Sequence, residues 1–210
     1  MYYGKIFNAV DRKVKGKRNI IQYSNAILSN VKIDIRGDNN SIIIEKNSIL
    51  NGTIFFIRGD NHKVHSGPAC RMKNGCIWFE DSSCCLSIGS QSSFGDVHIA
   101  LTEPNSCIEI GNDCMFAYDI DLRTGDSHSI IDSISGNRIN FAGNIIINDH
   151  VWVGAHSVIL KGVSLPENSI VATGSIVVKS FKDSGVIIAG NPAKEVRRGV
   201  SWTRSRGEAN

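Results

Sequence analysis

An aliphatic residue recurs at every sixth position over the C-terminal third of the chain. The series is Ile147, Val153, Ile159, Leu165, Val171 and Val177. A small or aliphatic residue also stands two positions before each member of the series. Neither an α-helix nor an alternating strand repeats every six residues. The pattern instead predicts an all-β solenoid, a parallel β-helix whose coils have three short flat faces and a corner after each.

Three hexapeptides make one coil, so residues 18 positions apart should stack on one another inside the solenoid. The prediction therefore pairs Ile147 with Leu165, Val153 with Val171 and Ile159 with Val177. Stacking of this kind buries the apolar face that a single coil leaves exposed. A shorter run of the same pattern precedes it, with Cys114 at an inward position and then Phe116 and Leu122.

Nearer the start the repeat is looser, but the sequence "IRGDN" occurs at 35–39 and again at 57–61. We interpret these segments as corners of two equivalent coils, with Gly37 and Gly59 in the positive-φ conformation. An adhesion role for the Arg-Gly-Asp triplet is the alternative, and the repeat explains the recurrence without it.

The six-residue register breaks between Leu122 and Ile147, which are separated by a polar, glycine-containing segment. An insertion in a solenoid leaves the stack as a loop, and such loops carry function. We therefore expect a protruding loop at 124–144. After Val177, Asn191-Pro192 and Gly199 predict a short C-terminal helix at about 191–198. The expected organisation is one domain over 1–199 and a tail over 200–210.

Composition narrows the function classes. The net charge of +3 is too small for a nucleic-acid-binding protein, and basic residues near both ends weakly favour an acidic partner. No apolar run has the length of a membrane span and no signal peptide is evident, which favours a cytoplasmic protein. The six cysteines contain no C-x-x-C, so we expect buried free thiols and no metal site.

Residues 108 to 202 resemble the left-handed β-helix acetyltransferases of the hexapeptide-repeat superfamily. The resemblance rests on "IGNDCMFA", "DSHSI", "GNRIN", "DHVWVGAHSVILKGV", "ATGSIVVKSF" and "AGNPAKEV", in that order. Within the superfamily the chain is most similar to bacterial capsular polysaccharide O-acetyltransferases, including those of sialic acid capsules. The resemblance implies acetyl transfer from acetyl-CoA to a glycan hydroxyl, and a homotrimer with sites between neighbouring solenoids.

The same resemblance assigns roles to individual residues. It implies that His128, in Asp126-Ser127-His128, is the catalytic histidine and that Trp152 lies beside the reacting groups. The implied donor contacts are Ala155, Thr173, Lys179, Lys194 and Arg197. From the residues themselves, Gly154 and Gly174 would let CoA approach the backbone closely, and the three cations suit its phosphates. On the acceptor side we place Asp96, Arg123 and Asp126.

A sugar hydroxyl is a weak nucleophile at neutral pH, so attack on a thioester needs a positioned base. A neutral imidazole suits that task because its reference pKa lies near neutral pH. We therefore expect direct transfer with His128 as general base and no covalent intermediate. Two alternatives stay open: a sugar N-acetyltransferase, because Asp96 stands where related enzymes have asparagine, and a catalytically silent β-helix that serves binding or assembly.

Overall fold

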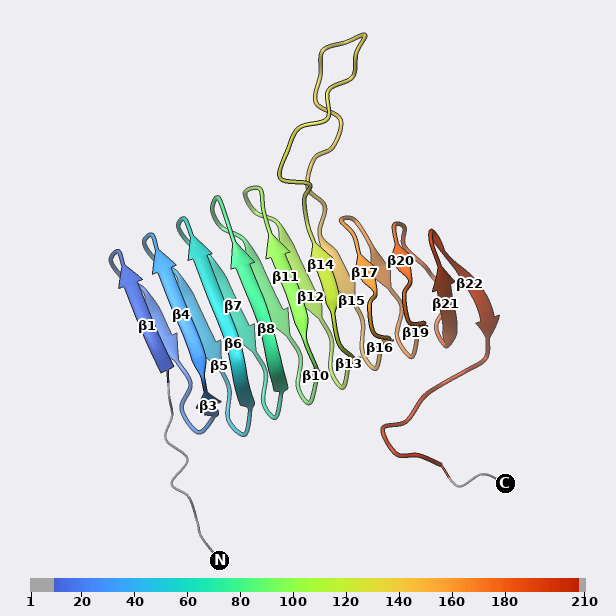
Figure 1. Ribbon diagram of the computed structural model, residues 1–210, viewed down its shortest axis with the longest axis horizontal. Helices are drawn as coiled ribbons and strands as arrows, with labels where there is room; N and C mark the ends of the chain where they lie inside the picture. The colour runs from blue at the N-terminus through green and yellow to red at the C-terminus, as the bar shows by residue number, and fades with distance from the viewer. Residues whose placement is uncertain (1–9, 208–210) are drawn as a thin grey trace, which may run out of the picture.

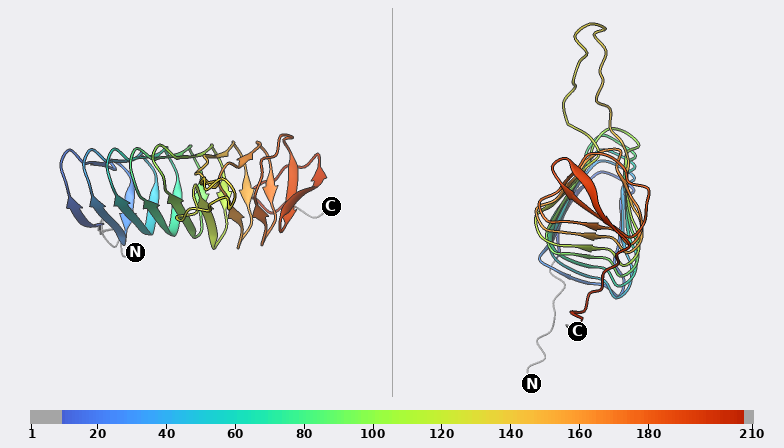
Figure 2. Two further views of the ribbon diagram at one scale, coloured as in Figure 1. Left: turned by 90° about the horizontal axis from the view of Figure 1, so that it is seen from above. Right: turned by 90° about the vertical axis from the view of Figure 1, so that its right-hand side faces the viewer.

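The computed structural model describes residues 10–207, which wind into one parallel β-helix (Figure 1). These described residues form 22 strands in two sheets, of 15 and 7 strands, and contain no α-helix. Viewed along its axis the stack has three sides, and one long loop projects from a single corner (Figure 2, right). The predicted all-β solenoid with a protruding loop is therefore confirmed.

We name the three sides faces A, B and C, in the order in which a coil passes through them. Face A contains β1 (Val10–Lys15), β4 (Val31–Arg36), β11 (Val97–Leu101), β14 (Ile120–Arg123), β17 (Val158–Ile159) and β20 (Ile176–Val177). Face B contains β2 (Ile20–Gln22), β5 (Ser41–Ile44), β7 (Lys63–Ser66), β9 (Cys85–Ile88), β12 (Cys107–Ile110), β15 (Ile145–Ile147) and β18 (Ser164–Leu165).

Face C contains β3 (Ile27–Ser29), β10 (Ser93–Phe94), β13 (Met115–Phe116), β16 (Trp152–Val153), β19 (Ile170–Val171) and β21 (Val186–Gly190). Two longer strands, β6 (Ile49–Arg58) and β8 (Arg71–Phe79), run from face C into face A without a break. This continuity joins faces A and C into the larger sheet. Every strand pairs in parallel with the next coil, except that β22 (Ala193–Arg198) lies antiparallel to β21.

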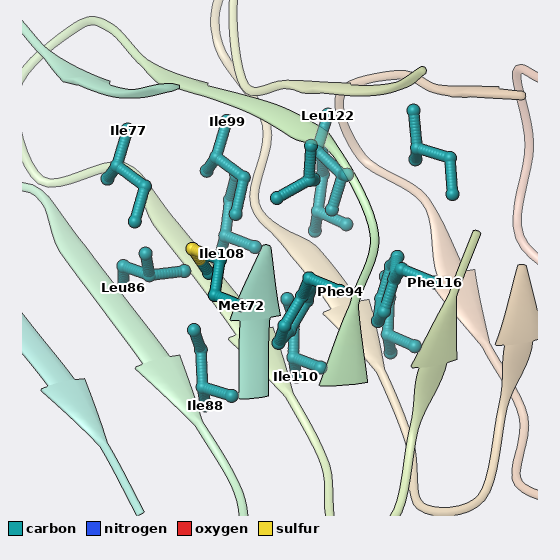
Figure 3. Packing of buried hydrophobic residues seen from close by; sticks show 14 of the residues in the cluster. Met72, Ile77, Leu86, Ile88, Phe94, Ile99, Ile108, Ile110, Phe116 and Leu122 are labelled. Atoms are coloured by element: carbon teal, nitrogen blue, oxygen red, sulfur yellow. The ribbon is translucent and has the colours of Figure 1, made fainter. Parts of the chain in front are cut away.

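The core is a set of aliphatic and aromatic columns along the inside of the stack. The three pairings predicted from the hexapeptide period are all present: Ile147 with Leu165, Val153 with Val171 and Ile159 with Val177. Figure 3 shows the middle of the core, where Phe94 and Phe116 of successive coils stack at 4.7 Å between ring centroids. Burial of each such side chain contributes about 1.5–3 kcal/mol, so columns rather than single contacts hold the coils together.

The "IRGDN" repeat occupies equivalent corners of adjacent coils, as predicted. Arg36 pairs with Arg58 across the coils, and Gly37 and Gly59 both have positive φ, at 146° and 112°. A Cβ on Gly37 would lie 1.9 Å from the carbonyl oxygen of Gly59. Glycine is therefore required there by the stacking of the coils, and this accounts for the recurrence of the motif.

Two predictions made from the sequence are wrong. The predicted helix at 191–198 is the strand β22, because the exposed edge of β21 offers backbone partners from Val186 to Gly190. The prediction of six free thiols also fails, since Cys85 and Cys107 form a disulfide on face B. Parallel register puts these two residues opposite each other with Cα atoms 4.6 Å apart, within disulfide reach.

The predicted tail packs back along the stack. Trp202 is 8% exposed and stacks on the imidazole of His150 at 4.2 Å between ring centroids. Its indole N–H donates to the carbonyl of His150, and Arg204 reaches Asp113 and Ser93 of earlier coils. Through Trp202 and Arg204 the tail thus packs on the folded body; residues 208–210 lie outside the described residues.

Candidate active site

His128 lies at the base of the projecting loop, where the loop leaves the corner between faces A and B (Figure 1). Its backbone N–H donates to the carbonyl of Asp126 at 2.8 Å, which forms a tight turn around Ser127 with φ of 62°. The imidazole is exposed and forms no hydrogen bond with any described residue. The turn therefore fixes the backbone of His128 and leaves its side chain accessible to a ligand.

Asn140, on the segment of the loop that returns to the solenoid, holds that turn in place. Its side-chain amide donates to the Asp126 carboxylate at 2.8 Å and to the His128 carbonyl at 2.7 Å. Its side-chain oxygen accepts from the backbone N–H of Ile130 at 2.7 Å. Asn140 is 6% exposed, so these hydrogen bonds form away from bulk water. The Asn140 side chain thereby connects the outgoing and the returning segments of the loop base beside His128.

Two ion pairs anchor the same loop base to the solenoid. Lys161, from the next coil, pairs with Asp126, and Arg138, from the loop, pairs with Glu103 of the preceding coil. The Lys161 ammonium, together with the Asn140 amide, lowers the pKa of Asp126. Arg138 likewise lowers the pKa of Glu103. Asp126, predicted on the acceptor side, is thus engaged in holding the loop. We call Glu103, Asp126, Arg138, Asn140 and Lys161 the loop brace.

A groove lies on the outer side of face A, directly beside the loop base. It encloses about 290 Å³ and is bordered by Trp78, Ala100 and Arg123 from three successive coils, and by Ser127 from the loop. Ser127 directly precedes His128 in the sequence, so the groove lies beside the turn that carries the candidate base. The predicted Arg123 is half-exposed here and pairs with Asp121 at 2.8 Å.

Trp152 lies on face C with its side chain partly exposed at 37%. The ring of Trp202 from the folded tail stands beside it, 6.2 Å away between centroids and tilted by 52°. Face C is opposite the corner that carries the loop (Figure 2, right). Within one chain, therefore, the fold does not bring Trp152 and His128 into one site.

Four of the predicted donor residues share the corner between faces C and A. Gly154 and Ala155 belong to one coil and Thr173 and Gly174 to the next, joined by a hydrogen bond from the Gly174 N–H to the Ala155 carbonyl at 2.8 Å. A Cβ on Gly154 would lie 2.7 Å from the backbone nitrogen of Thr173. The coil stacking itself therefore requires glycine at 154, whereas Gly174 has a positive φ of 72° and open space around it.

The remaining predicted residues are spread over the solenoid. Asp96 is at the same C-to-A corner as Ala155 but in an earlier coil, and Lys179 follows β20 at the corner below the loop. Lys194 and Arg197 are exposed on β22, the last strand. The fold thus groups His128, Arg123 and Asp126 at one corner and the glycine-containing donor residues at another.

The remaining cysteines and histidines of the described part of the chain are the candidates for a nucleophile or a metal site; Cys76 is a partly exposed free thiol, whereas Cys70, Cys84 and Cys114 are buried. Burial raises the pKa of the Cys114 thiol to about 11, so this inward-facing cysteine stays protonated at neutral pH. His150 and His156 sit at successive corners, each bonded to an aspartate of the coil before, Asp113 and Asp119. Within residues 10–207, no three His, Cys, Asp or Glu side chains gather as a metal site requires.

The sequence pointed to His128 and Asp126 but not to the other residues of the loop brace. Asn140 and Arg138 belong to the segment "GNRIN", which stood out in the sequence without a role. Lys161 and Glu103 carried no signal, because each meets its partner 35 positions away in the sequence only after the chain has coiled. The groove residues Trp78 and Ala100 lie in the part of the chain where the repeat looked loose.

Comparisons with known proteins show the family to which the chain belongs. No family model matches the chain. The polysialic acid O-acetyltransferase of Neisseria meningitidis is 34% identical over 192 residues, covering 90% of this chain and 88% of the relative. A polysialic acid O-acetyltransferase of Escherichia coli O1:K1 is 38% identical over 118 residues, which are 56% of this chain and 38% of the relative's length.

Two crystal structures are also similar. The polysialic acid O-acetyltransferase OatWY superposes with a TM-score of 0.89 at 29% identity, covering 95% of this chain and 94% of that chain. The polySia-specific acetyltransferase NeuO gives a TM-score of 0.75 at 33% identity, covering 94% and 89%. The whole described solenoid, including the coils before residue 108, is thus shared with these structures. No helix among the described residues is long and apolar enough to cross a membrane.

Proposed function

Since the chain belongs to the left-handed β-helix acetyltransferases that include the polysialic acid O-acetyltransferases, we propose that it transfers an acetyl group from acetyl-CoA to a hydroxyl of an acidic polysaccharide, with His128 as general base. The observation that supports this most is the exposed His128, held by its backbone in a turn whose Ser127 borders an open groove. Acetyl-CoA is a cytoplasmic metabolite, so the reaction is assigned to the cytoplasm.

The chemistry is a direct transfer. The acceptor hydroxyl gives its proton to the His128 imidazole as its oxygen attacks the thioester carbonyl carbon, and a tetrahedral oxyanion forms. Collapse of that intermediate re-forms the carbonyl and breaks the carbon–sulfur bond. The leaving thiolate takes the proton from the imidazolium, giving an acetyl ester and CoA. No cysteine is required, in keeping with the buried, protonated Cys114.

The donor would bind at the C-to-A corner, along Gly154, Ala155, Thr173 and Gly174. Trp152 is next to this corner on face C, and its partly exposed ring offers an apolar wall for the thioester end. Basic residues near the C-terminal end of the stack are proposed to pair with the CoA phosphates: Lys179, Lys194 and Arg197.

We propose that the active sites form between the subunits of a homotrimer. The loop that carries His128 projects from the corner opposite face C, so a donor beside Trp152 of one subunit would meet the His128 of a neighbouring subunit (Figure 2, right). The proposal therefore places each active site between two solenoids, with the loop of one subunit beside the C-to-A corner of the next.

The test measures free thiol release from acetyl-CoA in the presence of polysialic acid or of a neutral glycan, for the wild type and for His128→Ala. We expect release with the acidic polymer, and a fall in kcat of about 100- to 10,000-fold on loss of the base. His65→Ala, on face B, is the matched control and should keep full activity. An alkali-labile product identifies an ester, whereas an alkali-stable product identifies an N-acetyltransferase.

Mixed subunits complete the experiment. His128→Ala and Trp152→Ala should each be inactive alone, but trimers re-formed from a mixture contain sites with both native residues and should regain part of the activity. A fully active His128→Ala variant would refute the catalytic role. Failure to bind CoA or to release thiol with any glycan would favour the silent β-helix.

A further inference from the structure

A column of outward-facing side chains runs along face A toward the loop. Parallel register aligns one residue from each successive coil: Asp34, Phe56, Trp78, Ala100 and Arg123. Along the column the side chains change from acidic, through aromatic and small, to basic. It ends at Arg123, the last residue of β14, from which the loop leaves, and Ser127 of the loop borders the same groove.

The two aromatic rings of this column stack across the coils. The centroids of Phe56 and Trp78 are 4.3 Å apart and the ring planes differ by 29°. The Arg58 guanidinium lies over the Phe56 ring at 3.4 Å and pairs with Asp34 at 3.0 Å. Because the spacing of the rings is close to the coil spacing of about 4.8 Å, the rings lie across the stack. The side of Trp78 away from Phe56 therefore faces the next coil, at Ala100.

Ala100 creates a hollow at that position. Its methyl group is the only side chain of this column between Trp78 and Arg123, which are two coils or about 10 Å apart along the stack. His98 and Cys76 lie beside it on the neighbouring column, and Ser127 borders it from the loop. The gap between an aromatic ring and a guanidinium is wide enough to admit one sugar ring. We call it the Trp78–Arg123 hollow.

We infer that the Trp78–Arg123 hollow binds one ring of an acidic glycan acceptor and presents its hydroxyl to His128. The C–H face of the sugar packs on the free side of Trp78, and its carboxylate binds Arg123. Arg123 has donor capacity for this, because only its Nε is engaged with Asp121 and a guanidinium has five N–H groups. This inference rests on the proposed function and names the acceptor subsite that the function requires.

The exposure of Trp78 also fits a ligand surface. A tryptophan with 37% of its surface exposed, backed by a second ring and a cation, is held rigid and needs little ordering when a ligand binds. Sugar rings have apolar C–H faces and polar edges, and an indole flanked by polar groups matches both. Ser127 at the base of the loop borders the groove, so a ring bound there would lie beside the turn that carries His128.

The test compares Ala100→Leu, which fills the hollow, with Trp78→Ala, Trp78→Phe and Arg123→Gln. We expect Ala100→Leu and Trp78→Ala to raise the KM for an acidic glycan about tenfold or more, with the KM for acetyl-CoA unchanged. Trp78→Phe should retain most of the affinity. Arg123→Gln should raise the KM for an acidic glycan more than for a neutral one. Ile146→Ala, equally exposed on face B, is the control.

Unchanged acceptor KM in Ala100→Leu and Trp78→Ala, with an active wild type, overturns the inference and leaves the proposed function standing. A lower oligomeric mass for Trp78→Ala also overturns it, because the ring would then be a subunit contact. If the wild type shows no turnover, the proposed function fails, and binding is read from alkylation of Cys76. Polysialic acid should slow that alkylation, since Cys76 borders the hollow and the other free cysteines of the described chain are buried; no protection overturns the inference.

Discussion

The first and last coils of the solenoid differ in length. Equivalent positions are 21 to 23 residues apart in the coils before the loop, which we call the long coils. They are 17 or 18 residues apart after it, in the short coils. Face C is alike in both regions, with two-residue strands such as β10 and β16. Face A is not: β4 has six residues and β11 five, whereas β17 and β20 have two each. The extra residues of a long coil therefore widen face A and the corner that follows it.

This difference suits the two regions to different binding tasks. A wide face A provides outward columns that can hold a flat surface and a hollow, as Trp78 and Ala100 do. The narrow coils have sharp corners where backbone comes close to the surface, as at Ala155 and Gly174. The loop with His128 emerges where the two regions meet. In the proposed enzyme the long coils bind the acceptor and the short coils bind the donor.

The largest effect is expected at the junction, in Phe116→Ala. Phe116 stacks on Phe94 of a long coil and pairs with Val153 of the first short coil, and it is 2% exposed. Removing the ring should lower the free energy of unfolding by about 3–5 kcal/mol, because the rigid stack cannot close the cavity. Denaturant unfolding measures the loss.

The matched control for the junction is Val171→Ala, inside the short coils, with an expected loss of about 2 kcal/mol. Equal losses at the two positions would contradict a special role for the junction. If the two regions of Phe116→Ala unfold in separate transitions, Phe116 couples the unfolding of the long coils to that of the short coils, since a solenoid is held together coil by coil.

The sequence predicted the short coils better than the long ones for a physical reason. Where a face holds two residues and a corner four, inward positions fall every sixth residue, and Val153, Ile159 and Leu165 display the period directly. In the long coils the inward residues Val97, Ile99 and Leu101 are followed by a longer corner, so no single period describes the coil. The 22-residue repeat was nonetheless visible in "IRGDN".

The contacts of the loop brace could not be predicted from the sequence, for a different reason. Its contacts join Asp126 to Lys161 and Glu103 to Arg138, and both pairs depend on how many residues the insertion adds to its coil. Equivalent positions across the insertion are 37 residues apart, a spacing that no repeat pattern predicts. His128 could be identified from its motif, but its support had to be seen in the fold.

A smaller effect is expected for the loop brace, in Asn140→Asp. The carboxylate cannot donate to Asp126 or to the His128 carbonyl, and it places a second negative charge beside Asp126. We expect kcat to fall about 10- to 100-fold through misplacement of His128, with the KM for acetyl-CoA unchanged. Steady-state kinetics over a range of pH measure both quantities.

Asn137→Asp, exposed in the same loop, is the control for added charge and should keep its kcat. Combining Asn140→Asp with Asp126→Asn restores one amide and one carboxylate to the pair, and should recover part of the activity. If Asn140→Asp lowers the melting temperature of the whole solenoid instead of kcat, the residue supports the fold and does not position His128.

The smallest expected effect is a dependence of stability on pH, which arises from the polar groups buried inside the two regions. His62 is fully buried in the long coils, accepts the N–H of Cys84 and bonds to the carbonyl of Arg58, whereas the short coils bury serines at 157, 169 and 175. Burial lowers the pKa of His62 below its ordinary value. Below about pH 6.5 the unfolded chain therefore binds more protons at this residue than the folded chain does. Stability should be fully present above that pH and be lost as the pH falls through the folded pKa, at about 1.4 kcal/mol per unit of pKa difference.

His62→Asn, which matches the buried Asn40 of the preceding coil, should flatten this part of the stability–pH curve, and His65→Asn on face B should not. An unchanged slope in His62→Asn would show that His62 does not contribute to the loss of stability at low pH.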